Sequence, residues 1–287
     1  MSRSFCLVTL TYHGDAPAFA QLCKSIDRQM PHVKHYVLVD RSDLALFQPH
    51  ASANRVIVDC SQLIPQFKEF NAMGRRLWWR WPHRVVRGWI YQQLAKIRIA
   101  SMLEEDAAII VDSDAVFVRP IRLEQIFDGD RVKLYHVPGA GQAPEHCKWH
   151  DVAMRSFGMA AVGYTGFDYI STGVIWDPGV VRAMIERIES VSGRKWYDVL
   201  IANFRFSEYI EYGVFCERVE GPHQQRVSTT QEELCHCSWH YDVHSPDDVR
   251  RFVSDIQPHH CAILIQSNLK LEETQRQIIL SAFEIAA

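Results

Sequence analysis

Two aspartates, Asp112 and Asp114, directly follow an apolar run in the segment AAIIVDSDAVFV, residues 107–118. Burying a carboxylate is costly unless a cation or a hydrogen-bond donor compensates its charge. Residues i and i+2 of a strand point to the same face, so we expect both aspartates to point to one spot while Ser113 faces away. Mg²⁺ and Mn²⁺ bind carboxylates, with water and substrate phosphates as their other ligands. The pair therefore predicts a divalent-cation site, with a plain surface turn as the alternative.

Three apolar segments near the N-terminus predict the strands that would position this pair. They are residues 5–12 (FCLVTLTY), 35–43 (HYVLVDRSD) and 55–60 (RVIVDC), and a helical segment follows the first. Strand–helix–strand order predicts parallel βαβ units in one sheet. Ligands of such sheets bind at the carboxyl ends of the strands, where Asp40 would join the aspartate pair.

Other residues at this edge are candidates for holding the ligand. Thr11 and Tyr12 end the first strand, although such residues are also ordinary β composition. Asp40 ends the second strand, where capping of a turn is its alternative role. Each of the three is a candidate for contact with a nucleotide.

Two further segments contribute candidates. Gln93 and Lys96 lie three residues apart on a helix predicted from about residue 90 to residue 103, so they share a face and can reach phosphates. Solvation of that face is the alternative. Thr172 and Gly173 lie in a predicted strand, where an interior glycine marks either close approach of a ligand or a bulge.

The segment CHCSWHYDVH, residues 235–244, combines cysteine and histidine. Strand alternation would put its cysteines and histidines on opposite faces, which disfavours a shared zinc site. The histidine face can offer the cation a third protein ligand. We predict His240 for this role, with His260 as the second choice and an unligated histidine as the alternative.

The order of these segments resembles that of the GT-A glycosyltransferases, which use a metal-bound D-x-D motif to hold the diphosphate of a nucleotide sugar. LVTLTY is similar to the strand that receives the nucleoside, VDRSD to the strand whose acid approaches the base or ribose, and GWIYQQLAKIRIA to the helix before the D-x-D strand. YISTGVIW resembles the strand that lines the donor sugar, and FSEYIEYGVF the acidic segment beside the reacting sugar. The family's C-terminal metal-ligand motif does not align with this sequence.

The resemblance implies a chemical role for the remaining carboxylates. Glu208 would remove the proton of the acceptor hydroxyl in an inverting transfer, or hold the donor sugar in a retaining one. Glu211 competes for this role, and a structural role is the alternative for both. Ser113 would contact the ribose.

Two other functions compete with sugar transfer. Phosphatases of the haloacid-dehalogenase type also place D-x-D-x-[TV] after an apolar strand, and DSDAV fits that pattern. Their motif usually opens the first strand, whereas three predicted strands precede it here, and Asp247 and Asp248 are explained more simply as first-turn helix acids. A non-enzymatic sugar- or metal-binding module is the third hypothesis.

Composition restricts the class of protein. The chain has 287 residues, of which 47% are hydrophobic and 23% charged, and a formal net charge of −3, which is typical of a globular protein and not of a general nucleic-acid binder. No signal-peptide pattern or membrane span is evident, so we predict a cytoplasmic protein whose eight cysteines are reduced.

The segment from Arg75 to Trp89, RRLWWRWPHRVVRGW, mixes arginine and tryptophan. Tryptophan favours surfaces that are apolar on one side and wet on the other, and arginine binds phosphate. The segment is therefore a candidate for contact with a phosphate- or lipid-linked acceptor or with an anionic membrane. Core-filling tryptophans with solvated or paired arginines are the alternative.

Together these observations predict a single GT-A domain over residues 1–287, with a nucleotide-binding half (1–118) and an acceptor- and sugar-binding half (119–287). The predicted activity is Mn²⁺- or Mg²⁺-dependent transfer of a sugar, with a UDP-linked donor, to a surface polysaccharide, lipopolysaccharide or glycolipid precursor. The protein would work in the cytoplasm or peripherally at the inner face of the membrane.

Overall fold

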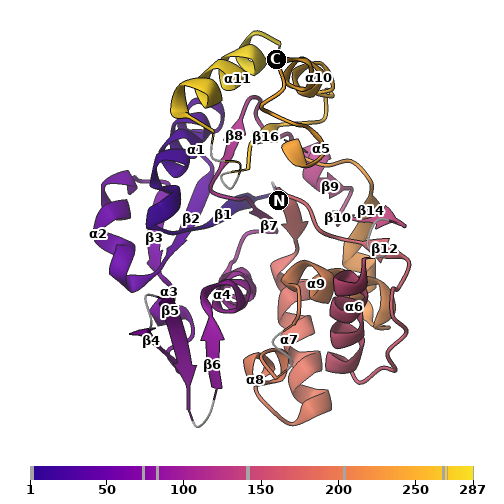
Figure 1. The fold of residues 1–287 in the computed structure, drawn as a ribbon. Coiled ribbons are helices and arrows are strands. Elements are labelled where there is room, and N and C mark those ends of the chain that lie inside the picture. The colour runs from indigo at the N-terminus through magenta and orange to yellow at the C-terminus, as the bar shows by residue number, and fades with distance from the viewer. Residues whose placement is uncertain are drawn as a thin grey trace.

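The computed structural model describes residues 3–72, 75–81, 84–139, 143–202, 205–266, 269 and 271–286. Its centre is a twisted sheet with helices on both sides (Figure 1). The strands of this sheet are, in spatial order, β13 (Val174–Trp176), β7 (Ala107–Ile110), β1 (Phe5–Thr11), β2 (Lys34–Val39) and β3 (Arg55–Asp59). β7, β1, β2 and β3 are mutually parallel, whereas β13 pairs antiparallel with β7. The predicted α/β class, with a mostly parallel mixed sheet flanked by helices, is confirmed.

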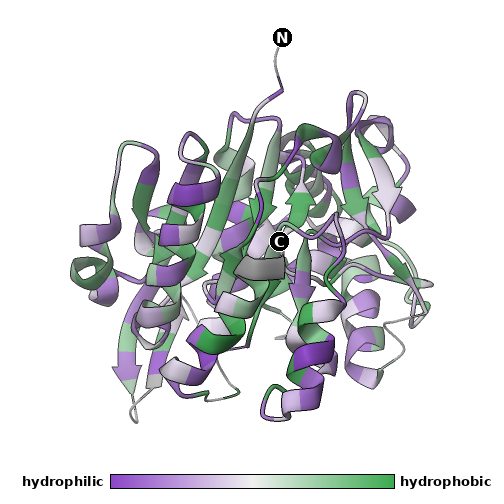
Figure 2. Ribbon diagram, turned by 90° about the horizontal axis from the view of Figure 1, so that it is seen from above, coloured by the Kyte–Doolittle hydropathy of each residue, from purple (hydrophilic) through white to green (hydrophobic). Residues whose placement is uncertain are grey.

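The apolar strands are explained by burial on both faces of this sheet. In β1, Cys6 and Val8 belong to the hydrophobic cluster that contains α4 (Gly88–Met102), whereas Leu7 belongs to the cluster that contains α1 (Ala16–Gln29). A strand covered on both sides needs apolar residues at every position and shows no alternation. Figure 2 shows the hydrophobic strands at the centre and hydrophilic residues along the surrounding helices.

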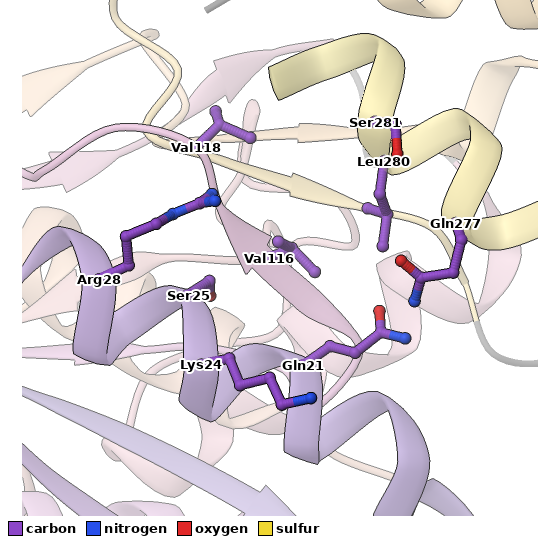
Figure 3. A pocket seen from close by; sticks show the side chains of 9 residues that line it. All are labelled: Gln21, Lys24, Ser25, Arg28, Val116, Val118, Gln277, Leu280 and Ser281. Atoms are coloured by element: carbon purple, nitrogen blue, oxygen red, sulfur yellow. The ribbon is translucent and has the colours of Figure 1, made fainter. Parts of the chain in front are cut away.

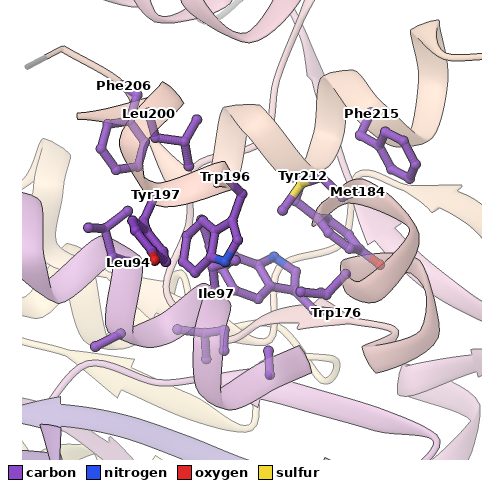
Figure 4. Packing of buried hydrophobic residues seen from close by; sticks show 14 of the residues in the cluster. Leu94, Ile97, Trp176, Met184, Trp196, Tyr197, Leu200, Phe206, Tyr212 and Phe215 are labelled. Atoms are coloured by element: carbon purple, nitrogen blue, oxygen red, sulfur yellow. The ribbon is translucent and has the colours of Figure 1, made fainter. Parts of the chain in front are cut away.

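The cluster that contains α4 also holds α9 (Glu208–Arg218), as Figure 4 shows. Leu94 and Ile97 of α4 are fully buried beside Trp176 of β13. The rings of Trp176 and Tyr212 stack at a centroid distance of 5.4 Å. This packing fixes α4 and α9 relative to the sheet, and these helices carry Lys96 and Glu208.

Smaller sheets surround the central one. They are formed by β4 (Phe67–Ala72), β5 (Arg75–Arg80) and β6 (Arg84–Arg87); by β15 (Cys235–Cys237), β16 (Ala262–Leu264) and β8 (Ala115–Phe117); by β14 (Val227–Thr230), β10 (Arg131–Tyr135) and β9 (Phe127–Asp128); and by β11 (Val137–Pro138) and β12 (Phe167–Asp168).

The remaining helices cover these sheets and their connections. The α-helices are α2 (Leu44–Phe47), α3 (Cys60–Leu63), α5 (Leu123–Ile126), α6 (Pro144–Ser156), α7 (Pro178–Ser192), α8 (Trp196–Leu200), α10 (Pro246–Ser254) and α11 (Glu273–Ala286), and the 3₁₀ helices are η1 (His13–Asp15), η2 (Arg41–Asp43), η3 (Gln48–His50), η4 (Pro222–Arg226) and η5 (Ser238–His240). Among the described residues, no helix has both the length and the apolar character needed to cross a bilayer.

Two predicted strands are shorter in the structure than in the sequence analysis. The segment 168–177 is interrupted between β12 and β13, because Gly173 adopts a left-handed conformation with φ of +83°. The segment 235–244 is extended only in β15 and then turns into η5, so the strand alternation expected for its cysteines and histidines ends at Cys237.

A buried ion-pair cluster attaches β5 to the end of β2. The Arg76 guanidinium lies 2.8 Å from Asp40 Oδ2 and 2.9 Å from Asp43 Oδ1. Burial raises the pKa of Asp40 and outweighs the effect of Arg76. Burial also opposes ionisation of Asp43, but hydrogen bonds from Arg76 and His13 lower its pKa to about 2. Arg76 therefore compensates two carboxylates that water reaches poorly.

Replacing Arg76 by methionine should strongly destabilise the protein. The change leaves Asp40 and Asp43 buried beside each other without their cation, and breaking a buried pair in this way costs roughly 3 kcal/mol or more. Urea denaturation at neutral pH measures the loss. Arg87→Met, at an exposed position on β6, is the matched control and should change the free energy of unfolding by less than about 0.5 kcal/mol. Equal effects of the two variants would contradict this account of the cluster.

Candidate active site

A cleft of about 380 Å³ lies at the carboxyl edge of the central sheet, where β1 and β7 end. The aspartate pair and Ser113 line it together with polar and aromatic side chains from distant parts of the chain. These are Tyr12, Asp15, Gln92, Lys96, Trp239 and Gln266.

Asp112 and Asp114 reach the same cleft through a turn and not through a strand. β7 ends at Ile110, and the Ala115 amide donates a hydrogen bond to the Asp112 carbonyl at 3.2 Å. Thr172 Oγ1 donates to Asp112 Oδ2 at 2.5 Å. The expectation that Ser113 faces away is wrong, because the turn brings Ser113 into the cleft lining as well.

Ser113 and Asp15 form a second contact at the cleft wall. Ser113 Oγ donates a hydrogen bond to Asp15 Oδ2 at 2.9 Å, although the two residues are 98 positions apart in the sequence. Tyr12 is 41% exposed beside them, and the charges of Asp15 and Asp114 together with partial burial raise the pKa of its hydroxyl. The Tyr12 ring is therefore an accessible, uncharged surface at the mouth of the cleft.

Lys96 is the basic residue of the cleft lining, and it is held by α9. Its ammonium lies 2.9 Å from Glu208 Oε1 and 2.9 Å from the Tyr209 hydroxyl. Burial alone would lower the pKa of Lys96, but the charges of Glu208 and, more weakly, Asp112 raise it well above its ordinary value. Lys96 is therefore a fixed, permanently charged cation beside the aspartate pair.

The charge of the cleft suits a divalent cation and a phosphate together. Among the described residues that line the cleft, the carboxylates of Asp15, Asp112 and Asp114 face the single ammonium of Lys96, which Glu208 already pairs. A diphosphate would meet net negative charge there unless a cation accompanied it. Mg²⁺ commonly binds through one or two protein carboxylates and completes its shell with water and phosphate oxygens. Asp112 and Asp114 fit that mode.

The structure does not bring a histidine to this pair. Among the described residues, no three His, Cys, Asp or Glu side chains are grouped so that they could hold a metal ion. His240 is exposed at the end of η5, and its carbonyl accepts a hydrogen bond from Arg251. His260 is buried and stacks on His236, and burial lowers its pKa to about 3. Neither His240 nor His260 completes a site with the aspartates in this structure.

Three residues that were predicted to contact a nucleotide do not line the cleft in the structure. Gln93 Oε1 accepts a hydrogen bond from the Glu208 amide at 3.1 Å, and it is the neighbouring Gln92 that lines the cleft. Asp40 is held by Arg76. Thr11 is buried, and among the described residues its hydroxyl has no hydrogen-bond partner.

Gly173 has a structural reason to be glycine. Its positive φ is unfavourable for other residues, and a Cβ atom would lie 3.2 Å from Leu234 Cβ. Its amide donates to the Ile110 carbonyl at 2.8 Å. The close approach at this position is therefore to another segment of the chain, and this geometry orients Thr172 toward Asp112.

Glu211 lies in the core and not in the cleft. It is fully buried, and burial raises its pKa to about 8 although the hydrogen bond with Ser156 opposes this. Ser156 Oγ lies 2.8 Å from both the Ala153 carbonyl and Glu211 Oε2. Because a hydroxyl has one proton, the neutral acid can donate to Ser156 while Ser156 donates to Ala153. Glu211 is thus a protonated core residue at neutral pH.

Four polar or aromatic cleft residues were not found from the sequence: Asp15, Gln92, Trp239 and Gln266. Asp15 ends a short 3₁₀ turn after β1. It could have been predicted by counting the turn after β1, and not only the strand end, as part of the edge where ligands bind. Trp239 and Gln266 follow β15 and β16. β15 pairs with β16, and β16 pairs with β8 directly after the aspartate turn. Only that tertiary pairing brings these two residues to the cleft.

Another cavity, of about 270 Å³, lies between α1, β8 and α11 (Figure 3). Lys24 and Arg28 of α1 and Gln277 of α11 surround an apolar floor of Val116 and Leu280. No carboxylate is among its described lining residues. The cavity is therefore unsuited to holding a cation and is distinct from the cleft.

The chain belongs to the family described as a family of unknown function, DUF6492, whose model matches residues 4–286. No curated protein matches the sequence.

Solved structures with a similar fold include three enzymes of sugar transfer. The galactosyltransferase LgtC in complex with donor and acceptor sugar analogues is 12% identical, with a TM-score of 0.43, and the match covers 96% of this chain and 94% of that chain. Mouse xyloside xylosyltransferase 1 is 12% identical, with a TM-score of 0.48, and the match covers 94% of this chain and 100% of that chain. The glycosyltransferase GlyE of Streptococcus pneumoniae is 13% identical, with a TM-score of 0.46, and the match covers 98% of this chain and 60% of that chain. At these identities and TM-scores the likeness does not establish a shared activity.

Replacing Glu211 by glutamine should change how stability depends on pH. The folded state keeps a proton on Glu211 between its ordinary pKa of 4.5 and about 8, whereas the unfolded state releases it. The stabilisation from Glu211 is therefore complete below pH 4.5 and is lost as the pH rises toward 8.

Urea denaturation of wild type and Glu211→Gln at several pH values measures this effect. The advantage of wild type should fall by up to about 1.4 kcal/mol per pH unit across this window. Glu220→Gln, at an exposed position, is the control and should follow wild type. A pH-independent difference between wild type and Glu211→Gln would show that Glu211 is ionised in the folded state.

Proposed function

We propose that this protein is a metal-dependent glycosyltransferase that transfers a sugar from a nucleotide sugar, with a UDP-linked donor as the first to be tested. The acceptor would be a precursor of a surface polysaccharide, lipopolysaccharide or glycolipid. One observation carries the proposal: the neighbouring carboxylates of Asp112 and Asp114 and the fixed ammonium of Lys96 line the same cleft at the carboxyl edge of a mostly parallel sheet.

Each part of the cleft suits a part of a nucleotide sugar. Tyr12 and Trp239 offer exposed rings at the wall, on which a base can stack. Ser113 and Asp15 offer hydrogen-bonding oxygens for ribose hydroxyls. Lys96 places a positive charge near the position of the phosphates. The first half of the chain, residues 1–118, supplies most of these groups and would hold the donor.

Asp112 and Asp114 would hold a Mn²⁺ or Mg²⁺ ion. When bound, this ion offsets the negative charge that develops on the departing nucleoside diphosphate. Thr172 would keep the Asp112 carboxylate oriented for this role through its hydrogen bond to Oδ2.

We assign Glu208 as a positioning residue. Its carboxylate is bound by Lys96, and it is 4% exposed behind the lysine. Removal of the acceptor proton by Glu208 stays a prediction that needs a direct test. Residues 119–287 would supply the acceptor side, and the protein would work in the cytoplasm with its acceptor presented at the membrane.

The phosphatase hypothesis has less support. β7 follows β1, β2 and β3 in the chain and borders the antiparallel β13, whereas the phosphatase motif opens the first strand of its domain. Asp247 and Asp248 lie in the first turn of α10 and pair with Arg250 and Arg251. They serve that helix and do not form a second acidic site beside the aspartate pair.

The aspartate pair can be tested by binding. Asp112→Asn and Asp114→Asn should each weaken Mn²⁺-dependent binding of UDP by more than about 100-fold, because each change removes a charged ligand and not an outer-shell partner. Isothermal titration calorimetry with and without EDTA measures this, and Asp130→Asn, at a fully exposed position, is the matched control. Wild-type UDP affinity in both cleft variants would exclude the proposed donor site, and hydrolysis of p-nitrophenyl phosphate would then favour the phosphatase.

The role of Glu208 can be tested with a double-mutant cycle. If Glu208 positions Lys96, Glu208→Gln and Lys96→Met should each raise the KM for the donor, and the double variant should be no worse than Lys96→Met alone. The pH dependence of kcat should then keep its shape in Glu208→Gln.

A general base behaves differently in the same experiment. Its loss would lower kcat by roughly 10²–10⁴-fold at an unchanged donor KM and remove the limb of the pH profile in which the base ionises. That result would replace the positioning role by direct catalysis.

A further inference from the structure

The sheet β4–β5–β6 has two faces of different composition, and the pairing register identifies them. One face carries the rows Phe67–Arg80–Arg84 and Glu69–Trp78–Val86 and the pair Asn71–Arg76. The other carries the rows Lys68–Trp79–Val85 and Phe70–Leu77–Arg87. We refer to them as the inner and outer face.

The inner face is packed against the rest of the molecule. Trp78 is 3% exposed and stacks on Tyr91 at 4.9 Å. Arg76 binds Asp40 and Asp43, and Arg80 lies 3.0 Å from Asp198. For Arg76 and Arg80 the structure therefore favours the alternative of paired arginines, because carboxylates of the protein hold their guanidinium groups.

The outer face exposes large apolar side chains. Phe70 is 37% exposed, Trp79 38%, Val85 45% and, directly after β5, Trp81 67%. Trp79 and Trp81 contact each other edge to face with ring centroids 5.6 Å apart. Figure 1 shows this sheet at the periphery of the molecule, away from α6, α7 and α9. Side chains of this size on one exposed face indicate a surface that another phase or molecule covers.

The charge of the outer face identifies what would cover it. Lys68 and Arg87 are exposed at opposite ends of the two rows, and neither forms an ion pair within the described part of the chain. The nearby acid, Glu69, is on the inner face, where it lies 3.4 Å from Arg76. The described residues of the outer face therefore include bases and aromatic rings but no acid.

We propose that the outer face docks on an anionic lipid surface. Tryptophan rings favour the interface between headgroups and acyl chains, and basic side chains are attracted to anionic headgroups. A symmetric contact with a second copy would bring like charges together instead. This inference extends the proposed function by naming the surface and the lipid chemistry through which the enzyme would meet a lipid-linked acceptor.

Vesicle sedimentation tests this proposal on the full chain. Vesicles of phosphatidylcholine alone are compared with vesicles that also contain phosphatidylglycerol, at low and high salt. Wild type should bind the anionic vesicles, and added salt should weaken this binding. The charge variant Lys68→Glu/Arg87→Glu and the aromatic variant Trp79→Ala/Trp81→Ala should each lose at least about tenfold in affinity.

Matched controls separate the outer face from general changes in charge and hydrophobicity. Lys24→Glu/Arg28→Glu changes the net charge by the same amount on α1, and Ile278→Ala removes an exposed apolar side chain of α11. Both should bind vesicles like wild type. UDP binding with Mn²⁺ should be unchanged in all these variants, so a failure of the membrane proposal is distinguishable from a failure of the proposed function.

Three results would overturn the proposal: no binding of wild type to anionic vesicles, equal binding to neutral vesicles, or equal losses in the control variants. Light scattering after size-exclusion chromatography tests the alternative that a second copy of the chain covers the outer face. A dimer that the aromatic variant dissociates would assign the outer face to a second copy of the chain.

Discussion

The ion pair between Lys96 and Glu208 is the contact on which the geometry of the cleft depends. An ammonium whose side chain is 14% exposed needs a compensating charge, and Glu208 of α9 supplies it across 112 positions of sequence. The Glu208 amide also donates to Gln93, so two residues of α4 hold the first turn of α9. Since α9 packs through Tyr212 on Trp176 of β13, which pairs with β7, the cation and the aspartates are fixed by one packed body.

Compensation of charge at strand ends explains which acids can meet a ligand. At the end of β2, Arg76 pairs with Asp40 and Asp43, and this edge is closed by protein. After β7, Asp112 has a hydroxyl donor in Thr172, and both aspartates line an open cleft. A hydroxyl compensates a carboxylate only in part, because it brings no positive charge. Asp112, which accepts a hydrogen bond from a hydroxyl and lines the open cleft, is thus better placed than Asp40 or Asp43 to meet a cation from outside the protein.

The fold class and the position of the aspartate pair at the carboxyl edge of the sheet were predictable from the sequence, because both depend on local signals. Apolar runs ending in acids reveal parallel strands, and D-x-D at the end of one of them locates the ligand edge. The phase of α4 was not predictable, because the helix is buried on most sides and its apolar residues form no clear stripe. The sequence prediction therefore names Gln93, whereas Gln92 and Lys96, four residues apart, are the pair that lines the cleft. Trp239 depends on the pairing of β8 with β16, which no local pattern encodes.

In the segment RRLWWRW, composition and alternation alone do not predict which face of the strand is buried, because the burial depends on ion pairs with distant acids. Its period of two places Arg76, Trp78 and Arg80 on one face and Leu77, Trp79 and Trp81 on the other. Hydropathy alone would bury the second set, because these three side chains are large and apolar and their face carries a single arginine of the segment, Arg75. The structure buries the first, because Asp40, Asp43 and Asp198 are available there to neutralise the arginines. The more apolar set is consequently left at the surface, so the exposure of Trp79 and Trp81 is a consequence of where the acids lie.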